Sequence, residues 1–124
     1  MIRLLLLALC GLLACQQLWA HHSTAANFTR EIIEISGRIE QIRFLNPHSS
    51  FVVLTDEANE TGPYWLVESD ARSTFQRKGL NLDEIEQGIR VEISGRRGLR
   101  PNTMYLREIR FEDGRVFTSD GLEE

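Results

Sequence analysis

The three histidines of the chain are the residues with the clearest potential for chemistry. His21 and His22 are neighbours, and His48 ends the turn-like tripeptide Asn-Pro-His. Imidazole nitrogen suits copper, zinc and nickel. Cleavage after Ala20 would add the α-amine of His21 as a ligand, giving a set that resembles a copper-binding histidine brace. The sequence therefore predicts a copper site made by His48 with His21 or His22. Solvated loop histidines are the alternative.

One carboxylate and three arginines are further candidates. Glu68 lies in a strand-like segment, on the face opposite Trp65, and could ligate the metal or orient a histidine; a solvated strand residue is the alternative. Arg96, Arg97 and Arg100 flank glycines in the expected loop after the fourth strand. Clustered arginines suit a carboxylate, a phosphate or an anionic polymer. A solvated hairpin loop is the other interpretation of this group.

The sequence shows no recognisable catalytic set. It has no serine in a nucleophile elbow, no glycine-rich phosphate loop and no cysteine pairs spaced for zinc. The only two cysteines, Cys10 and Cys15, lie within the first twenty residues. We therefore expect a binding protein, with a metal ion, a small ligand or an envelope protein as its partner. A metal-dependent enzyme is a further alternative.

The charge balance argues against nucleic acid as a partner. The chain has 14 basic and 18 acidic residues. Removing a leader that contains Arg3 leaves 13 basic residues against the same 18 acidic ones, a net charge near −5. Phosphate backbones are held mainly by lysine and arginine, so this surface would mostly repel them.

The first twenty residues have the pattern of a signal peptide. Arg3 supplies the positive start, and the apolar run of residues 4–14 is too short to span a membrane as a helix. Cleavage after Ala20 would release a periplasmic protein. Leu-Leu-Ala-Cys at residues 12–15 also resembles a lipobox, which would make the chain an outer-membrane lipoprotein anchored at Cys15. We expect a signal peptide at 1–20, one domain at 21–118 and an acidic tail at 119–124.

The remaining elements are expected to form mainly β structure. Alternating apolar residues, turn signals and one helical pattern predict strands at 32–44, 50–55, 64–68, 89–96, 104–111 and 116–118, a helix at 71–78 capped by Asp70 and ended by Gly79, and a short helical turn at 80–87. Gly37 predicts a bulge or bend in the longest strand. This order is that of a small OB-like barrel of five to six strands with one or two short helices. An open α+β sheet is the alternative.

The same alternation predicts which side chains are buried. Trp65 is expected to pack in the core beside Val67. The other positions expected inside are Ile33, Ile35, Ile39, Val53, Val91, Ile93, Leu106 and Ile109, and in the short helical turn Leu82 and Ile85.

Several short motifs resemble a known group of proteins. They are His-His-Ser at 21–23, Ile-Ser-Gly at 35–37, Asn-Pro-His at 46–48, Trp65, Glu68, Gly-Leu at 79–80 and the stretch at 88–95. The chain resembles a family of short exported bacterial proteins of unknown function, whose mature chains begin His-His-Ser and carry an Asn-Pro-His turn. The resemblance implies a periplasmic location and does not indicate an activity. The resulting prediction is a periplasmic binding domain for copper or another transition metal, with a non-catalytic envelope structural or interaction module as the alternative.

Overall fold

A computed structural model describes residues 26–118 and 121–123. Strands make up most of this part of the chain, joined by two short helical segments. In chain order the elements are β1 (Phe28–Arg43), β2 (Ser49–Asn59), β3 (Gly62–Ser69), α2 (Arg72–Arg77), the 3-10 helix η3 (Leu82–Glu84), β4 (Arg90–Gly98), β5 (Thr103–Phe111), β6 (Val116–Thr118) and β7 (Gly121–Glu123). No helix among the described residues is long and apolar enough to cross a membrane.

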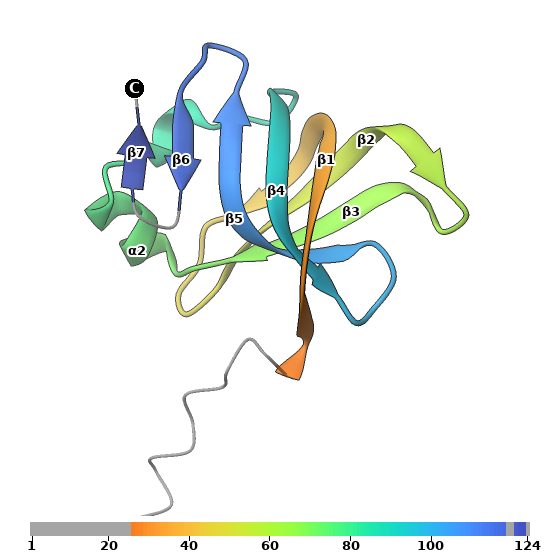
Figure 1. Ribbon diagram of the computed structural model, residues 1–124. Helices are drawn as coiled ribbons and strands as arrows, with labels where there is room; N and C mark the ends of the chain where they lie inside the picture. The colour runs from red at the N-terminus through yellow and green to blue at the C-terminus, as the bar shows by residue number, and fades with distance from the viewer. Residues whose placement is uncertain (1–25, 119–120, 124) are drawn as a thin grey trace, which may run out of the picture.

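The first five strands close into a hydrogen-bonded ring (Figure 1). Antiparallel ladders join β3 to β2, β2 to β1, β1 to β4 and β4 to β5. A short parallel ladder, in which residues 66–68 of β3 pair with residues 103–105 of β5, completes the ring. This is the predicted OB-like order with α2 between β3 and β4, so the mainly β, OB-like fold class is confirmed.

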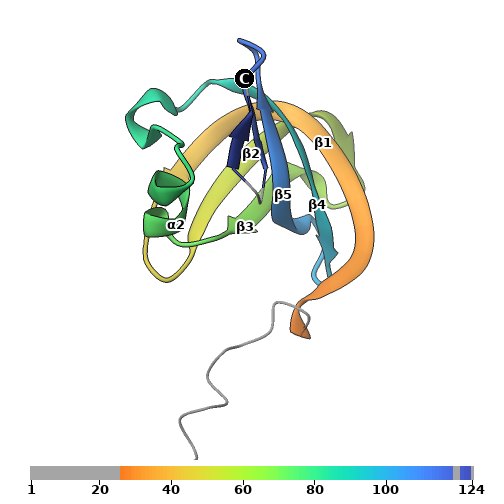
Figure 2. The same ribbon diagram turned by 60° about the vertical axis from the view of Figure 1, so that its left-hand side comes forward.

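β1 is shared between two neighbours, and Gly37 lies where they overlap. The strand pairs with β4 from Phe28 to Arg38 and with β2 from Gly37 to Arg43, and Figure 2 shows its strong curvature. A Cβ atom at Gly37 would lie 2.1 Å from the carbonyl oxygen of Leu54, so only glycine allows this close approach. The expected bend is present, but the register shift falls between Ile39 and Gln41.

The inward faces of the strands meet the helices in one core. Phe75 of α2 is buried and packs against an aromatic group of Phe44, Phe51 and Phe117, with ring centroids 5.1–6.3 Å apart. Aromatic pairs at such distances stabilise a core beyond the apolar area that they bury. The helix thus covers one end of the ring.

The predicted faces of the strands are confirmed at almost every position. Trp65 is buried, as are Ile39, Val53, Val67, Leu82, Ile85, Val91, Ile93, Leu106 and Ile109. Ile33 and Ile35 are only half-buried, although they pack against the core. Their part of β1 has no ladder to β2, so the interior is less enclosed there.

The predicted ends of several strands were wrong. β1 begins at Phe28, before the expected start at residue 32, because Phe28 pairs with Gly98 of a longer β4. β2 continues beyond the expected end at residue 55 to Asn59, which pairs with Gly62. β7 lies in the expected acidic tail, where it pairs with β6. In each case pairing with a neighbouring strand extends the element beyond the residues that alternate clearly in the sequence.

Asp70 does not cap the helix as predicted. The N-cap of α2 is Ala71, which makes no side-chain cap hydrogen bond. The Asp70 carboxylate instead accepts a hydrogen bond from the hydroxyl of Tyr105. The expected stop at Gly79 is confirmed, since this residue has φ +90°, a conformation that favours glycine.

Asn102 ties the loop between β4 and β5 to the β2–β3 hairpin. Its side-chain oxygen accepts hydrogen bonds from Asn59 Nδ2 (2.7 Å) and Thr61 Oγ1 (2.6 Å). Its side-chain nitrogen donates to the carbonyl oxygens of Gly62 (3.0 Å) and Tyr64 (3.1 Å). One amide group thereby satisfies its full hydrogen-bonding capacity and holds the hairpin in place.

Replacing Gly37 by alanine is expected to lower the free energy of unfolding by about 2–3 kcal/mol, because the new methyl group meets backbone that cannot easily move. Ser36→Ala, at the exposed neighbouring position, is the matched control and should change stability by less than about 0.5 kcal/mol. Urea denaturation of the three proteins measures both effects. Equal stability of Gly37→Ala and wild type would contradict the close approach of β1 and β2.

Candidate functional site

The Asn-Pro-His turn lies between β1 and β2 and is anchored to the helix. The side-chain oxygen of Asn46 accepts hydrogen bonds from the backbone N–H and the hydroxyl of Ser73, both at 3.3 Å. Ser49, directly after the turn, is buried, and its hydroxyl bonds with the backbone of Leu45. His48 itself is exposed. The turn is therefore held firmly while its imidazole remains accessible.

A series of contacts connects this turn to the beginning of β1. The backbone N–H of Ser49 donates to the carbonyl oxygen of Asp70 (3.0 Å). The Asp70 carboxylate accepts from the hydroxyl of Tyr105 (2.7 Å). The Tyr105 ring contacts that of Phe28, with centroids 5.3 Å apart. The turn and the start of β1 thus lie at the same end of the ring, as both views show (Figures 1 and 2).

The hydroxyl of Tyr105 is hydrogen-bonded to Asp70 and has a strongly raised pKa. Burial raises the pKa of the Tyr105 hydroxyl well above its ordinary value, and the hydrogen bond and negative charge of Asp70 raise it further. The ammonium group of Lys78 lies 3.8 Å from the same carboxylate. The tyrosine therefore stays protonated as a hydrogen-bond donor and joins β5 to the segment after β3.

Glu68 and the three predicted arginines each contact a neighbouring side chain. Glu68 is half-buried on the outer face of β3 and pairs with Arg100 (3.2 Å). The guanidinium of Arg96 lies over the ring of Tyr105 at 5.3 Å. Arg97 pairs with Glu31 (2.9 Å). The three arginines therefore do not converge on a common point.

The expected position of the arginines also needs correction. Arg96 and Arg97 belong to β4, whose ladder with β5 continues through both residues, and only Arg100 lies in the following loop. Consecutive residues of a strand face opposite sides, so Arg96 and Arg97 are directed apart. Arg100 remains the most accessible of the three, with 73% of its side chain exposed.

The predicted metal ligands are only partly within the described structure. His21 and His22 lie outside the described residues, while His48 and Glu68 lie within them. Among residues 26–118 and 121–123, no group of three or more histidine, cysteine, aspartate and glutamate side chains is arranged to hold a metal ion. A site at His48 would therefore require ligands from the N-terminal segment.

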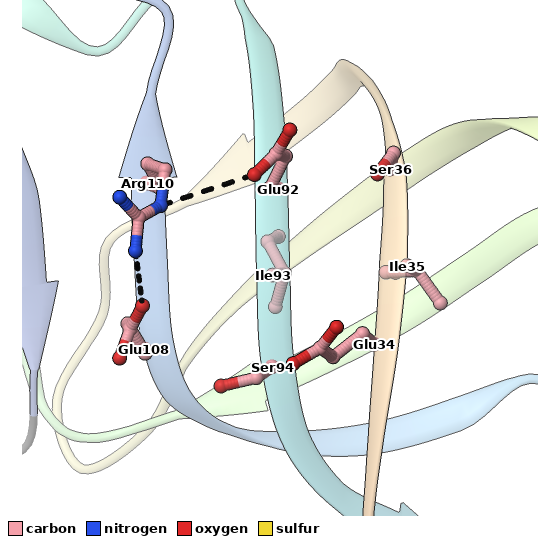
Figure 3. A pocket seen from close by; sticks show the side chains of 8 residues that line it. All are labelled: Glu34, Ile35, Ser36, Glu92, Ile93, Ser94, Glu108 and Arg110. Carbon is pink, nitrogen blue, oxygen red and sulfur yellow. Dashed lines mark hydrogen bonds and ion pairs between the residues drawn. The ribbon is translucent and has the colours of Figure 1, made fainter. Parts of the chain in front are cut away.

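A shallow cavity of about 450 Å³ lies on the outer face of β1, β4 and β5 (Figure 3). Its polar side chains form rows across the three strands. Ser94 pairs in register with Glu34 and Glu108, and Glu92 pairs with Arg110. Arg110 also makes ion pairs with both Glu92 (3.8 Å) and Glu108 (3.3 Å). This face is acidic, and its arginine is already neutralised.

Sequence reasoning missed the Tyr105–Asp70 pair. The only signal was the outward position of Tyr105 in its strand. The partner could not be found, because the two residues meet only through the parallel closure of β3 against β5.

Three comparisons with known proteins complete the description. A family model described as "Family of unknown function (DUF6152)" matches residues 10–104. No curated protein matches the chain. Among solved structures, the crystal structure of the ZRD-deleted mutant of TiaS in complex with agmatine is similar, with a TM-score of 0.45 and 16% sequence identity. The match covers 65% of this chain and 21% of that one, so this chain spans about a fifth of that structure's length. A similarity of this size carries no argument about fold or function.

Tyr105→Phe is expected to lower the free energy of unfolding by about 1 kcal/mol at neutral pH, because the hydrogen bond to Asp70 is lost. The pKa of Tyr105 is raised in the folded state, so the unfolded chain alone releases this proton as the pH rises above about 10. The free energy of unfolding of the wild type should therefore exceed that of Tyr105→Phe by a constant amount below about pH 10, and the difference should shrink above that pH. Urea denaturation from neutral to alkaline pH measures the difference.

Tyr64→Phe is the matched control, because the side chain of Tyr64 is exposed. It should follow the wild type over the whole pH range. A difference between wild type and Tyr105→Phe that does not change above pH 10 would contradict the perturbed tyrosine.

Proposed function

The chain belongs to the Family of unknown function (DUF6152), and we propose that it is an exported binding domain that holds copper between its N-terminal histidines and His48. The observation that carries the proposal is the anchored turn. It presents an exposed imidazole at the end of the ring where β1 begins. His21 or His22 would supply the remaining nitrogen ligands, and cleavage after Ala20 would add the α-amine.

The length of the N-terminal segment is compatible with this arrangement. Ala26, the first described residue, lies five positions after His21, and an extended chain of that length reaches about 17 Å. The contacts from Phe28 through Tyr105 and Asp70 to Ser49 support a short path from the start of β1 to His48. Amine and imidazole nitrogens favour copper over other divalent ions of the first transition row.

Glu68 has a smaller part in this proposal than the histidines. Its carboxylate already accepts a hydrogen bond from Arg100, so it would have to exchange that partner to ligate a metal. The same ion pair bears on the alternative of anion binding, because an anion at Arg100 would compete with Glu68. The copper proposal therefore depends on the three histidines.

A non-catalytic envelope interaction module is the second candidate. Leu45 and Leu99 are 56% and 68% exposed. Exposed leucines can contribute to contacts with another protein. In this candidate the chain could also be a lipoprotein anchored at Cys15.

The exported protein is expected to begin at His21 and to carry no lipid. The small residue before the cut and the positive, apolar start of the chain support cleavage after Ala20. Intact mass spectrometry of the protein recovered from the cell envelope measures this. A diacylglycerol-modified Cys15 at the N-terminus would remove the free amine of His21 and favour the second candidate.

Copper binding is expected to weaken at least about tenfold in His48→Ala and in a form extended before His21, since each change removes a ligand. His48→Ala should fold normally, because the side chain is exposed. Binding should also weaken at acidic pH, where protons compete for the nitrogen ligands. Calorimetric titration with Cu(II) of the exported protein and both variants measures these effects.

Leu45→Ala, in the same turn, is the matched control and should bind copper like the wild type. Equal affinity of the wild type, His48→Ala and the extended form would show that copper uptake is adventitious. The interaction module would then be the better supported function.

A further inference from the structure

A second cavity, of about 500 Å³, opens where β1 and β2 separate. The ladder between these strands ends at the pair Gly37–Thr55. Before Gly37, β1 continues beside β4, whereas β2 continues beyond Thr55 with β3 as a projecting hairpin (Figure 1). The cavity lies between the two, and we refer to it as the β1–β2 cleft. Its volume is in the range of small-molecule sites.

Trp65 lines this cleft although only 8% of its surface is exposed. Its indole N–H forms no hydrogen bond with the described residues. Yet in this part of the chain no buried side-chain nitrogen or oxygen lacks a partner. The N–H therefore retains some exposed surface, and the cleft is a cavity that Trp65 lines. An almost buried donor that faces a cavity is available to an acceptor on a ligand.

The walls of the cleft carry an excess of negative charge. Asp56 is neutralised by Arg90, whose two terminal nitrogens contact its two carboxylate oxygens at 3.0 and 2.5 Å. Glu34 and Glu57 also line the cleft, and within the described residues neither makes an ion pair. Two carboxylates are thus free to attract a cation.

We propose that the β1–β2 cleft binds a small organic cation that also carries hydroxyl oxygens, such as an amino sugar or an amino alcohol. Its ammonium group would lie near Glu34 and Glu57, and an oxygen would accept the hydrogen bond of Trp65. The site shares no residue with the proposed copper site. Asn102 holds the hairpin wall of the cleft in place, so little ordering is required on binding.

Trp65 makes the proposal directly testable, because the only other tryptophan of the chain is Trp19. In a Trp19→Phe form of the full chain, fluorescence and the single indole N–H resonance in an NMR spectrum both report on the cleft. Glucosamine at millimolar concentration should shift both signals. Glucose, which has a hydroxyl in place of the ammonium group, should bind at least about fivefold more weakly. Choline tests whether an amino alcohol is preferred to an amino sugar.

Substitutions of the carboxylates test whether glucosamine binds in the β1–β2 cleft. Glu34→Gln and Glu57→Gln should each weaken glucosamine binding about two- to fivefold, and both are exposed positions that should not affect folding. Glu92→Gln, on the acidic face outside the cleft, is the matched control and should leave binding unchanged. Equal binding of glucosamine and glucose, an equal effect of all three variants, or an indole signal that no probe shifts would overturn the proposal.

Discussion

The whole architecture depends on one strand, β1, which pairs with both β4 and β2. The two ladders overlap at Gly37, where there is no room for a side chain. At Gly37 the backbone of β1 approaches that of β2 so closely that a Cβ atom would lie 2.1 Å from a carbonyl oxygen. This contact lets β1 turn from β4 to β2 and so brings the two halves of the ring together. The curvature also creates the β1–β2 cleft, because β1 leaves β2 on the other side of the same residue.

The alternation of apolar residues was a reliable guide to the faces of the strands. A period of two shows directly which side of a strand meets the core. Val53, Val67, Val91 and Ile93 are accordingly buried. The ends of the strands were less predictable. Polar residues such as Asp56 and Asn59 resemble a turn in the sequence, but a partner strand and the amide of Asn102 hold them in a hairpin.

The sequence predicted the positions of individual candidate residues better than their contacts. It located His48 in a turn and Glu68 on the face opposite Trp65. It did not predict that Glu68 pairs with Arg100 or that Arg96 lies over Tyr105, because both contacts depend on how β3, β4 and β5 meet in the ring. The copper site remains a prediction, since His21 and His22 lie outside the described residues.

The pairing of the first strand with a late one has a consequence for how the chain folds. β1 cannot complete its ladder until β4, more than fifty residues later, is available, and the parallel seam of β3 and β5 needs β5 as well. Contacts between such distant parts of a chain make folding slow, because the entropy of closing long loops is lost before the contacts form. The early segments of this chain therefore cannot form a stable core before the later ones are available.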